Sequence, residues 1–114
     1  MKFKHQHQFL DRKNESARVL QKYPDRRPII CEKQENSKLD EIDKKKYLVP
    51  SDLTLQQFIY VVRKRLRLNA EVAIFLFVNS KIKPGTSTIN QIYETDADPD
   101  GFLYFTYASE NVFG

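Results

Sequence analysis

The sequence predicts an α+β fold in a β-grasp arrangement, in which three or four strands form a sheet and one amphipathic helix crosses it. Short runs rich in aromatic and branched residues recur along the chain, and such runs are typical of strands. Between them, the stretch that begins at Thr54 changes to the apolar spacing of one helix face, and a shorter helix is indicated before the last strand.

The N-terminal part of the chain is predicted to be helical. From Phe9 to Tyr23, apolar side chains lie among charged ones in an imperfect helical pattern, and Pro24 is expected to end it. We therefore expect one or two helices in an N-terminal extension of residues 1–24. Residues 25–114 are expected to form the β-grasp domain, packed with the extension as one compact unit.

Four short segments are predicted to be strands. Pro28–Glu32 and Tyr47–Val49 flank a polar stretch and are expected to pair in an antiparallel manner. Ala73–Val78 and Phe102–Ala108 supply two more strands. The single cysteine, Cys31, falls in the first strand, and we expect it to be buried there rather than to act as a nucleophile.

Two pairs of residues mark where helices begin. Thr54 with Gln57 has the spacing of a capping box, and Thr88 with Gln91 repeats it. The first pair opens the clearest helix of the chain, and the second opens a short helix that we expect to extend through Tyr93. On the first helix, one side consists of Leu55, Phe58, Ile59, Val62 and Leu66, and the other carries Arg63, Lys64 and Arg67.

The composition limits the class of protein. With 114 residues, 40% hydrophobic and 30% charged, the chain suits one globular domain. Its longest apolar run, Ala73–Val78, is far shorter than the roughly 18 residues that a membrane span needs. Residues 1–10 lack the apolar core of a secretory signal, so we expect a cytosolic chain.

Two motifs suggest metal chemistry, but the surrounding residues do not support it. His5 and His7 are spaced so that a helix would place them on different faces, and we expect surface residues. Asp96–Gly101 matches the opening of a calcium loop, but Pro99 is unfavourable there and Tyr107 stands where the last ligand should be. We expect an acidic turn, with no metal ion and no cofactor.

The formal net charge of +4 favours acidic partners or anionic lipid surfaces. The basic residues lie in clusters, among them Lys44–Lys46 and Arg63–Arg65. No helix-turn-helix pattern, zinc-finger spacing or RNA-binding aromatic signature accompanies them, so we expect no specific nucleic-acid partner. A solvated surface explains most of these charges.

The chain ends on Gly114, after a strand-like run and a short polar link. Because glycine has no Cβ, its carboxylate can enter a narrow active site, where another enzyme can adenylate it, transfer it to a thiol and join it to an amine. We interpret the terminal glycine as a reactive handle.

Five distinctive blocks occur in order along the chain, namely Pro28–Lys33, Lys44–Pro50, Arg63–Arg65, Ile74–Asn79 and Asp100–Tyr104. Together they resemble the autophagy ubiquitin-like modifiers, the light-chain-3 and GABARAP family. The resemblance covers the chain from about Phe9 to Gly114.

The resemblance implies a ubiquitin-like β-grasp with a four-stranded mixed sheet, a crossing helix and two N-terminal helices. It also implies a modifier that is not an enzyme. In this family a cysteine protease exposes the terminal glycine and deconjugates the product. An activating and a conjugating enzyme carry the glycine as thioesters, and it ends as an amide on phosphatidylethanolamine. Gly114 is the matching residue. The expected location is the cytoplasm, the autophagosome membrane after lipidation, and the vacuole or lysosome.

The resemblance further implies binding of receptor peptides with an aromatic-x-x-aliphatic motif, which add a strand at the edge Lys46–Val49. Acidic residues beside the motif are expected near Arg26, Lys44 and Lys45. The expected aromatic pocket consists of Glu15, Val19, Pro28, Ile30, Lys46, Leu48 and Phe102. The expected aliphatic pocket consists of Tyr47, Val49, Pro50, Leu53, Phe58, Val61 and Val62.

Residue type alone favours a core role for several of these positions, namely Ile30, Leu53, Phe58, Val61 and Val62. Arg27 stands where the family usually has an aliphatic residue, and a charge beside Pro28 at the groove is expected to alter receptor choice.

Two other functions stay open. One is an unconjugated ubiquitin-like adaptor that binds peptides in trafficking or on the cytoskeleton. The other is a basic scaffold that binds cytoskeleton or nucleic acid through its N-terminal helices.

Overall fold

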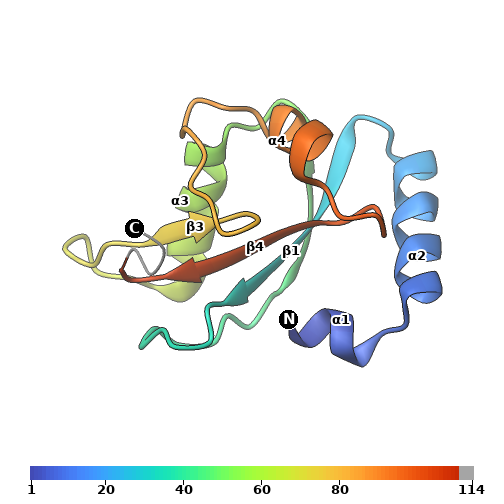
Figure 1. The fold of residues 1–114 in the computed structure, drawn as a ribbon. Helices are drawn as coiled ribbons and strands as arrows, with labels where there is room; N and C mark the ends of the chain where they lie inside the picture. The colour runs from blue at the N-terminus through green and yellow to red at the C-terminus, as the bar shows by residue number, and fades with distance from the viewer. Residues whose placement is uncertain (111–114) are drawn as a thin grey trace.

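A computed structural model describes residues 1–110, so the expected handle at Gly114 lies outside the described residues. Helices and strands are mixed along the chain (Figure 1). In order they are α1 (Lys2–Gln6), α2 (Phe9–Lys22), β1 (Arg26–Lys33), β2 (Lys46–Pro50), α3 (Leu55–Leu66), β3 (Phe75–Phe77), α4 (Ile89–Asp96) and β4 (Leu103–Ala108). Among residues 1–110, none of the helices is long and apolar enough to span a bilayer.

The four strands form one mixed sheet with the order β2-β1-β4-β3. The two central strands, β1 and β4, run parallel, with Ile29 opposite Leu103. The outer pairs are antiparallel, and Ile29 also lies opposite Tyr47 of β2. The antiparallel pairing predicted for the first two strands is confirmed, as is the α+β fold with its two N-terminal helices.

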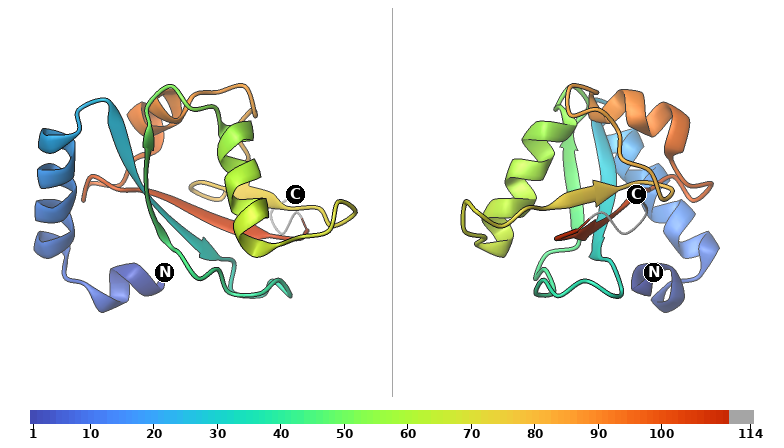
Figure 2. Two further views of the ribbon diagram at one scale, coloured as in Figure 1. Left: turned by 180° about the vertical axis from the view of Figure 1, so that it is seen from behind. Right: turned by 60° about the vertical axis from the view of Figure 1, so that its left-hand side comes forward.

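The sheet separates α3 on one face from α1 and α2 on the other (Figure 2). Successive residues of β1 point to opposite faces, as strand geometry requires. Ile29 and Cys31 therefore join the main buried cluster with Phe58 of α3, whereas Ile30 joins a second cluster with Phe3 of α1. Cys31 is buried as predicted, and burial raises the pKa of its thiol. Two hydrophobic layers result, one for each set of helices.

Both predicted capping boxes are present, and they fix where α3 and α4 begin. The helix predicted to extend through Tyr93 continues to Asp96. The strand predicted over Ala73–Val78 is shorter, because β3 pairs with β4 only from Phe75 to Phe77. Beyond that point the chain turns back on itself, and Val78 pairs with Lys81 instead.

This turn contains two residues in the left-handed region, Asn79 with φ 50° and Ser80 with φ 63°. Two such residues between the paired Val78 and Lys81 form the turn that most favours the sequence Asn-Gly. We expect Ser80→Gly to raise the free energy of unfolding by roughly 0.5–1 kcal/mol, because it removes a strained Cβ. Urea unfolding followed by circular dichroism measures this. Ser80→Ala keeps the Cβ and serves as the control; an equal gain in that variant would contradict the explanation.

Candidate functional site

The outer edge of β2 is the first element of the candidate site. Among the described strands, β2 pairs only with β1 and lies at one end of the sheet. The N–H of Cys31 donates to the carbonyl of Lys45 at 2.8 Å, so alternation directs the main-chain groups of Lys46 and Leu48 away from β1. Arg26 Nη1 donates to the Leu48 carbonyl at 3.3 Å. The edge is a template on which another strand can pair.

The residues predicted for the aromatic pocket come from α2, β1, β2 and the residue that precedes β4. An ion pair joins α2 to β2, with Glu15 Oε2 2.6 Å from Lys46 Nζ. Ile30 and Phe102 share the second buried cluster and are 0% and 1% exposed. These two side chains are therefore fully covered in this structure. The other members are Pro28, which is buried, and Val19 and Leu48, which are half-buried.

The residues predicted for the aliphatic pocket belong largely to the α3 face of the sheet. Four of them, Tyr47, Val49, Phe58 and Val62, lie in the main buried cluster, and the partly buried Leu53 packs against it. The core role that residue type favoured therefore holds for Phe58 and Val62. The surface that a ligand can contact at this end comes from Val61, which is 39% exposed, and from the exposed Pro50.

The predicted contacts for acidic flanking residues lie beside the start of β2. Lys44 is exposed and places Nζ 5.1 Å from the centre of the Tyr47 ring. Lys45 is half-buried, and within residues 1–110 neither lysine forms an ion pair. Arg26 is directed to the Leu48 carbonyl. The two lysines therefore remain available to an acidic group.

Arg27 lies on the opposite face of β1 from Pro28 and opposite Val49 of β2, so its charge is directed away from the predicted aromatic pocket, and its effect on receptor choice stays a prediction. Its guanidinium donates to Asn90 Oδ1 at 3.0 Å and to the Pro24 carbonyl at 2.8 Å, and it lies 5.5 Å from the centre of the Tyr93 ring. Strand alternation is the reason, because neighbouring residues of β1 face different layers. Arg27 connects the turn after α2 to α4.

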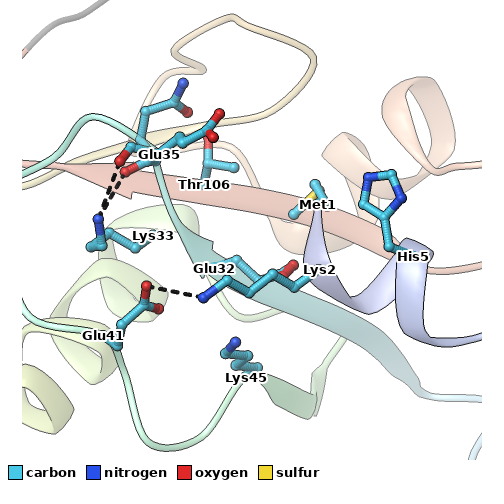
Figure 3. Close-up of a pocket in the computed structure, with 10 residues that line it drawn as sticks. Met1, Lys2, His5, Glu32, Lys33, Glu35, Glu41, Lys45 and Thr106 are labelled. Atoms are coloured by element: carbon cyan, nitrogen blue, oxygen red, sulfur yellow. Dashed lines mark hydrogen bonds and ion pairs between the residues drawn. The ribbon is translucent and has the colours of Figure 1, made fainter.

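A hollow of about 540 Å³ lies beside α1, at the end of β1 (Figure 3). Acidic and basic side chains mix around it. Lys2 Nζ lies 3.4 Å from Glu41 Oε1, and Lys33 Nζ donates to the Ser37 carbonyl at 3.0 Å. Lys45 is the one residue of the predicted candidate site that lines this hollow within residues 1–110, so the hollow is not the predicted aromatic pocket.

The acidic turn before β4 holds the N-terminal helices, a role that sequence reasoning did not assign. Asp98 forms an ion pair with Lys4 of α1. Burial opposes ionisation of Asp98, but the hydrogen bonds from Lys4 and from the Asp100 N–H keep its pKa below the usual value. The Lys4 ammonium also lies 4.5 Å from the centre of the Tyr104 ring.

Asp100 is the fully buried centre of this turn. Its Oδ2 accepts hydrogen bonds from Arg12 of α2 and from the Tyr104 hydroxyl, both at 2.5 Å. Burial, and then the bond to Asp100, raise the pKa of Tyr104. The Asp100 carbonyl accepts from Ser16 at 2.5 Å, and Gly101 has φ +89° where a Cβ would lie 2.2 Å from Ser16 Oγ. Only glycine therefore allows α2 to approach this turn so closely.

The pattern rejected as a calcium loop was the signal for this role. Asp98 and Asp100 of this pattern pair with cations of α1 and α2, and Asp96 pairs with Lys83. Within residues 1–110, no group of three or more histidine, cysteine or acidic side chains is placed to hold a metal.

The sheet order, the crossing α3 and the free edge of β2 define a ubiquitin-like β-grasp protein with an N-terminal helical extension. A family model described as "Autophagy protein Atg8 ubiquitin like" matches residues 11–114. Autophagy-related protein 8 of Coccidioides immitis is 56% identical over 113 residues, which are 99% of this chain and 97% of the relative. That of Aspergillus niger is also 56% identical over 113 residues, 99% of this chain and 96% of the relative. The crystal structure of Trypanosoma brucei ATG8 is similar with a TM-score of 0.90 and 46% identity, covering 95% of this chain and 93% of that one. The chain belongs to the Atg8 family of ubiquitin-like modifiers that act in autophagy.

Proposed function

We propose that the protein is conjugated through Gly114 to phosphatidylethanolamine and recruits receptors to that membrane through the outer edge of β2. Family membership supports the conjugation, since it is the known role of Atg8 proteins, and Gly114 supplies the matching carboxylate. The unpaired edge of β2 is the structural observation that supports receptor binding.

The proposed conjugation proceeds in balanced steps at the Gly114 carboxylate. The carboxylate attacks ATP to form an acyl adenylate and releases pyrophosphate, and a cysteine of the activating enzyme then displaces AMP. The thioester passes to a cysteine of the conjugating enzyme. Finally, the lipid amine attacks the thioester, so that an amide forms and the thiol leaves. In this scheme the other proteins supply the catalytic groups, and the chain itself is not an enzyme.

The remaining proposed partners are a cysteine protease and the membrane itself. A cysteine protease would expose Gly114 and later hydrolyse its amide to release the protein. The two acyl chains of a phospholipid hold a protein stably at a bilayer, whereas a single chain holds it only marginally. The proposed location therefore changes with conjugation, from the cytoplasm to the autophagosome membrane and then to the vacuole or lysosome.

Receptor binding is proposed to begin when Lys46 moves away from Glu15 and exposes the aromatic pocket. This ion pair is partly exposed, and such pairs contribute little to stability. The aliphatic residue of the motif would contact Val61 and Pro50, farther along β2, so the peptide is proposed to run parallel to this strand. Acidic residues that precede the motif would then lie near Lys44.

The conjugation is tested by incubating the purified chain with Atg8-family activating and conjugating enzymes, ATP and phosphatidylethanolamine liposomes. We expect the intact mass to increase by one lipid less one water, with no increase in a variant that lacks Gly114. Mass spectrometry of both chains measures this.

A second substrate shown to be lipidated in the same reaction controls for enzyme activity. No mass gain on this chain, while that substrate reacts, would contradict the conjugation and favour an unconjugated peptide-binding adaptor.

A further inference from the structure

Phe3 of α1 packs against residues that were predicted to line the aromatic pocket. Its ring centre lies 5.3 Å from that of Phe102 in an edge-on arrangement, and Ile30 belongs to the same buried cluster. The ammonium of Lys46 lies 5.4 Å from the centre of the Phe3 ring. One side chain outside the predicted pocket is therefore close to both its covered floor and its exposed edge.

The main chain fixes Phe3 in this position. Its N–H donates to both carboxylate oxygens of Glu32, at 3.2 and 3.3 Å, and Glu32 is only 4% exposed. Moving Phe3 away would leave a buried carboxylate without this donor, which is costly. The pairs of Lys2 with Glu41 (Figure 3) and of Lys4 with Asp98 hold the rest of α1. Lys46, in contrast, is exposed and can move.

We propose that Phe3 is a positioning residue of the aromatic pocket: it forms a fixed wall, while Lys46 is the movable cover. An entering aromatic ring would extend the existing cluster of Phe3, Phe102 and Tyr104, and such ring pairs contribute more than buried area alone. Phe3 therefore sets the preference for an aromatic over an aliphatic side chain at the first position of the receptor motif. This inference rests on the receptor binding proposed above.

The test compares three acidic synthetic peptides with the cores Trp-x-x-Leu, Leu-x-x-Leu and Trp-x-x-Ala, titrated calorimetrically into the full chain. We expect Phe3→Leu to weaken binding of the Trp-x-x-Leu peptide about tenfold, or about 1.4 kcal/mol. In this variant, the ratio of affinities for the Trp-x-x-Leu and Leu-x-x-Leu peptides should fall by the same factor. The ratio of affinities for the Trp-x-x-Leu and Trp-x-x-Ala peptides should stay unchanged. Phe9→Leu, the same change at an exposed phenylalanine of α2, should alter neither preference.

Four results would overturn the inference. Unchanged binding by Phe3→Leu would mean that the ring plays no part, and tighter binding would mean that Phe3 occupies the pocket and must leave it. An equal loss for all three peptides would mean that Phe3 only maintains the fold. If the unaltered chain binds none of the peptides, the proposed receptor binding fails as well. Thermal unfolding confirms that each variant is folded; should Phe3→Leu not fold, Phe3→Met carries the same test.

Discussion

Replacing Lys46 and Leu48 together by alanine is expected to weaken binding of an acidic Trp-x-x-Leu peptide by at least about a hundredfold. Central residues of an interface commonly cost 2 kcal/mol or more each when truncated, so two of them reach this magnitude. Leu48 is the half-buried residue of β2 with outward main-chain groups, and Lys46 lies between Glu15 and Phe3. Isothermal titration or the chemical shifts of the labelled protein measure the change.

The matched control is the double variant Lys81→Ala with Ile82→Ala. It also removes one lysine and one aliphatic side chain, both exposed, from the turn after β3 near the other end of the sheet. Its affinity should remain within about twofold of the unaltered chain, because it lies outside the candidate site. If the Lys46 and Leu48 double variant keeps the affinity of the unaltered chain, the two-pocket site is contradicted. If both double variants lose affinity equally, binding does not depend on the edge of β2.

Replacing Asp100 by asparagine is expected to lower the free energy of unfolding by about 3–5 kcal/mol, the usual cost of breaking a buried ion pair. Asparagine has nearly the same shape, but it leaves Arg12 without its anion in a site where that side chain is 12% exposed. The Tyr104 hydroxyl and the Phe102 N–H donate to different oxygens of Asp100, and asparagine keeps only one oxygen, so one of these two donors loses its acceptor. Urea unfolding followed by circular dichroism measures the loss.

Asp43→Asn is the matched control, because it removes the same type of group from a pair with Arg65 that is largely exposed. Its unfolding midpoint should scarcely move, since exposed ion pairs contribute little to stability. If Asp100→Asn also leaves the midpoint unchanged, the Asp100 carboxylate does not hold α2, and its pair with Arg12 contributes little to stability.

The division of the chain into an extension of residues 1–24 and a domain of residues 25–114 stays a prediction. Contacts between the two parts connect them closely. Arg12 and Ser16 of α2 both bond to Asp100, and Phe3 of α1 packs on Phe102. The helices that precede β1 therefore share polar and apolar contacts with the segment that opens β4. A single cooperative transition in the urea unfolding of the unaltered chain would show that the two parts unfold together.

Local patterns in the sequence determined most of the secondary structure. The Thr54 and Thr88 capping boxes begin their helices where predicted, since a cap depends on residues three positions apart. The strand around Cys31 and its antiparallel neighbour were also predicted correctly. The length of β3 was not, because it depends on how far β4 extends beside it. Pairing partners are distant in the sequence, so local patterns carry little information about them.

For the candidate site too, some features were predictable from the sequence and others depended on tertiary contacts. By itself, the sequence determined which residue types are present, including the basic run before β2 and the terminal Gly114, and its ordered blocks indicated the family. Only the tertiary structure decided that Arg27 faces α4, that Ile30 and Phe102 are covered, and that Asp98 and Asp100 bind cations of the N-terminal helices. The physical reason is that burial and charge pairing arise between segments as many as 94 positions apart, such as Lys4 and Asp98, and these meet only when the sheet forms.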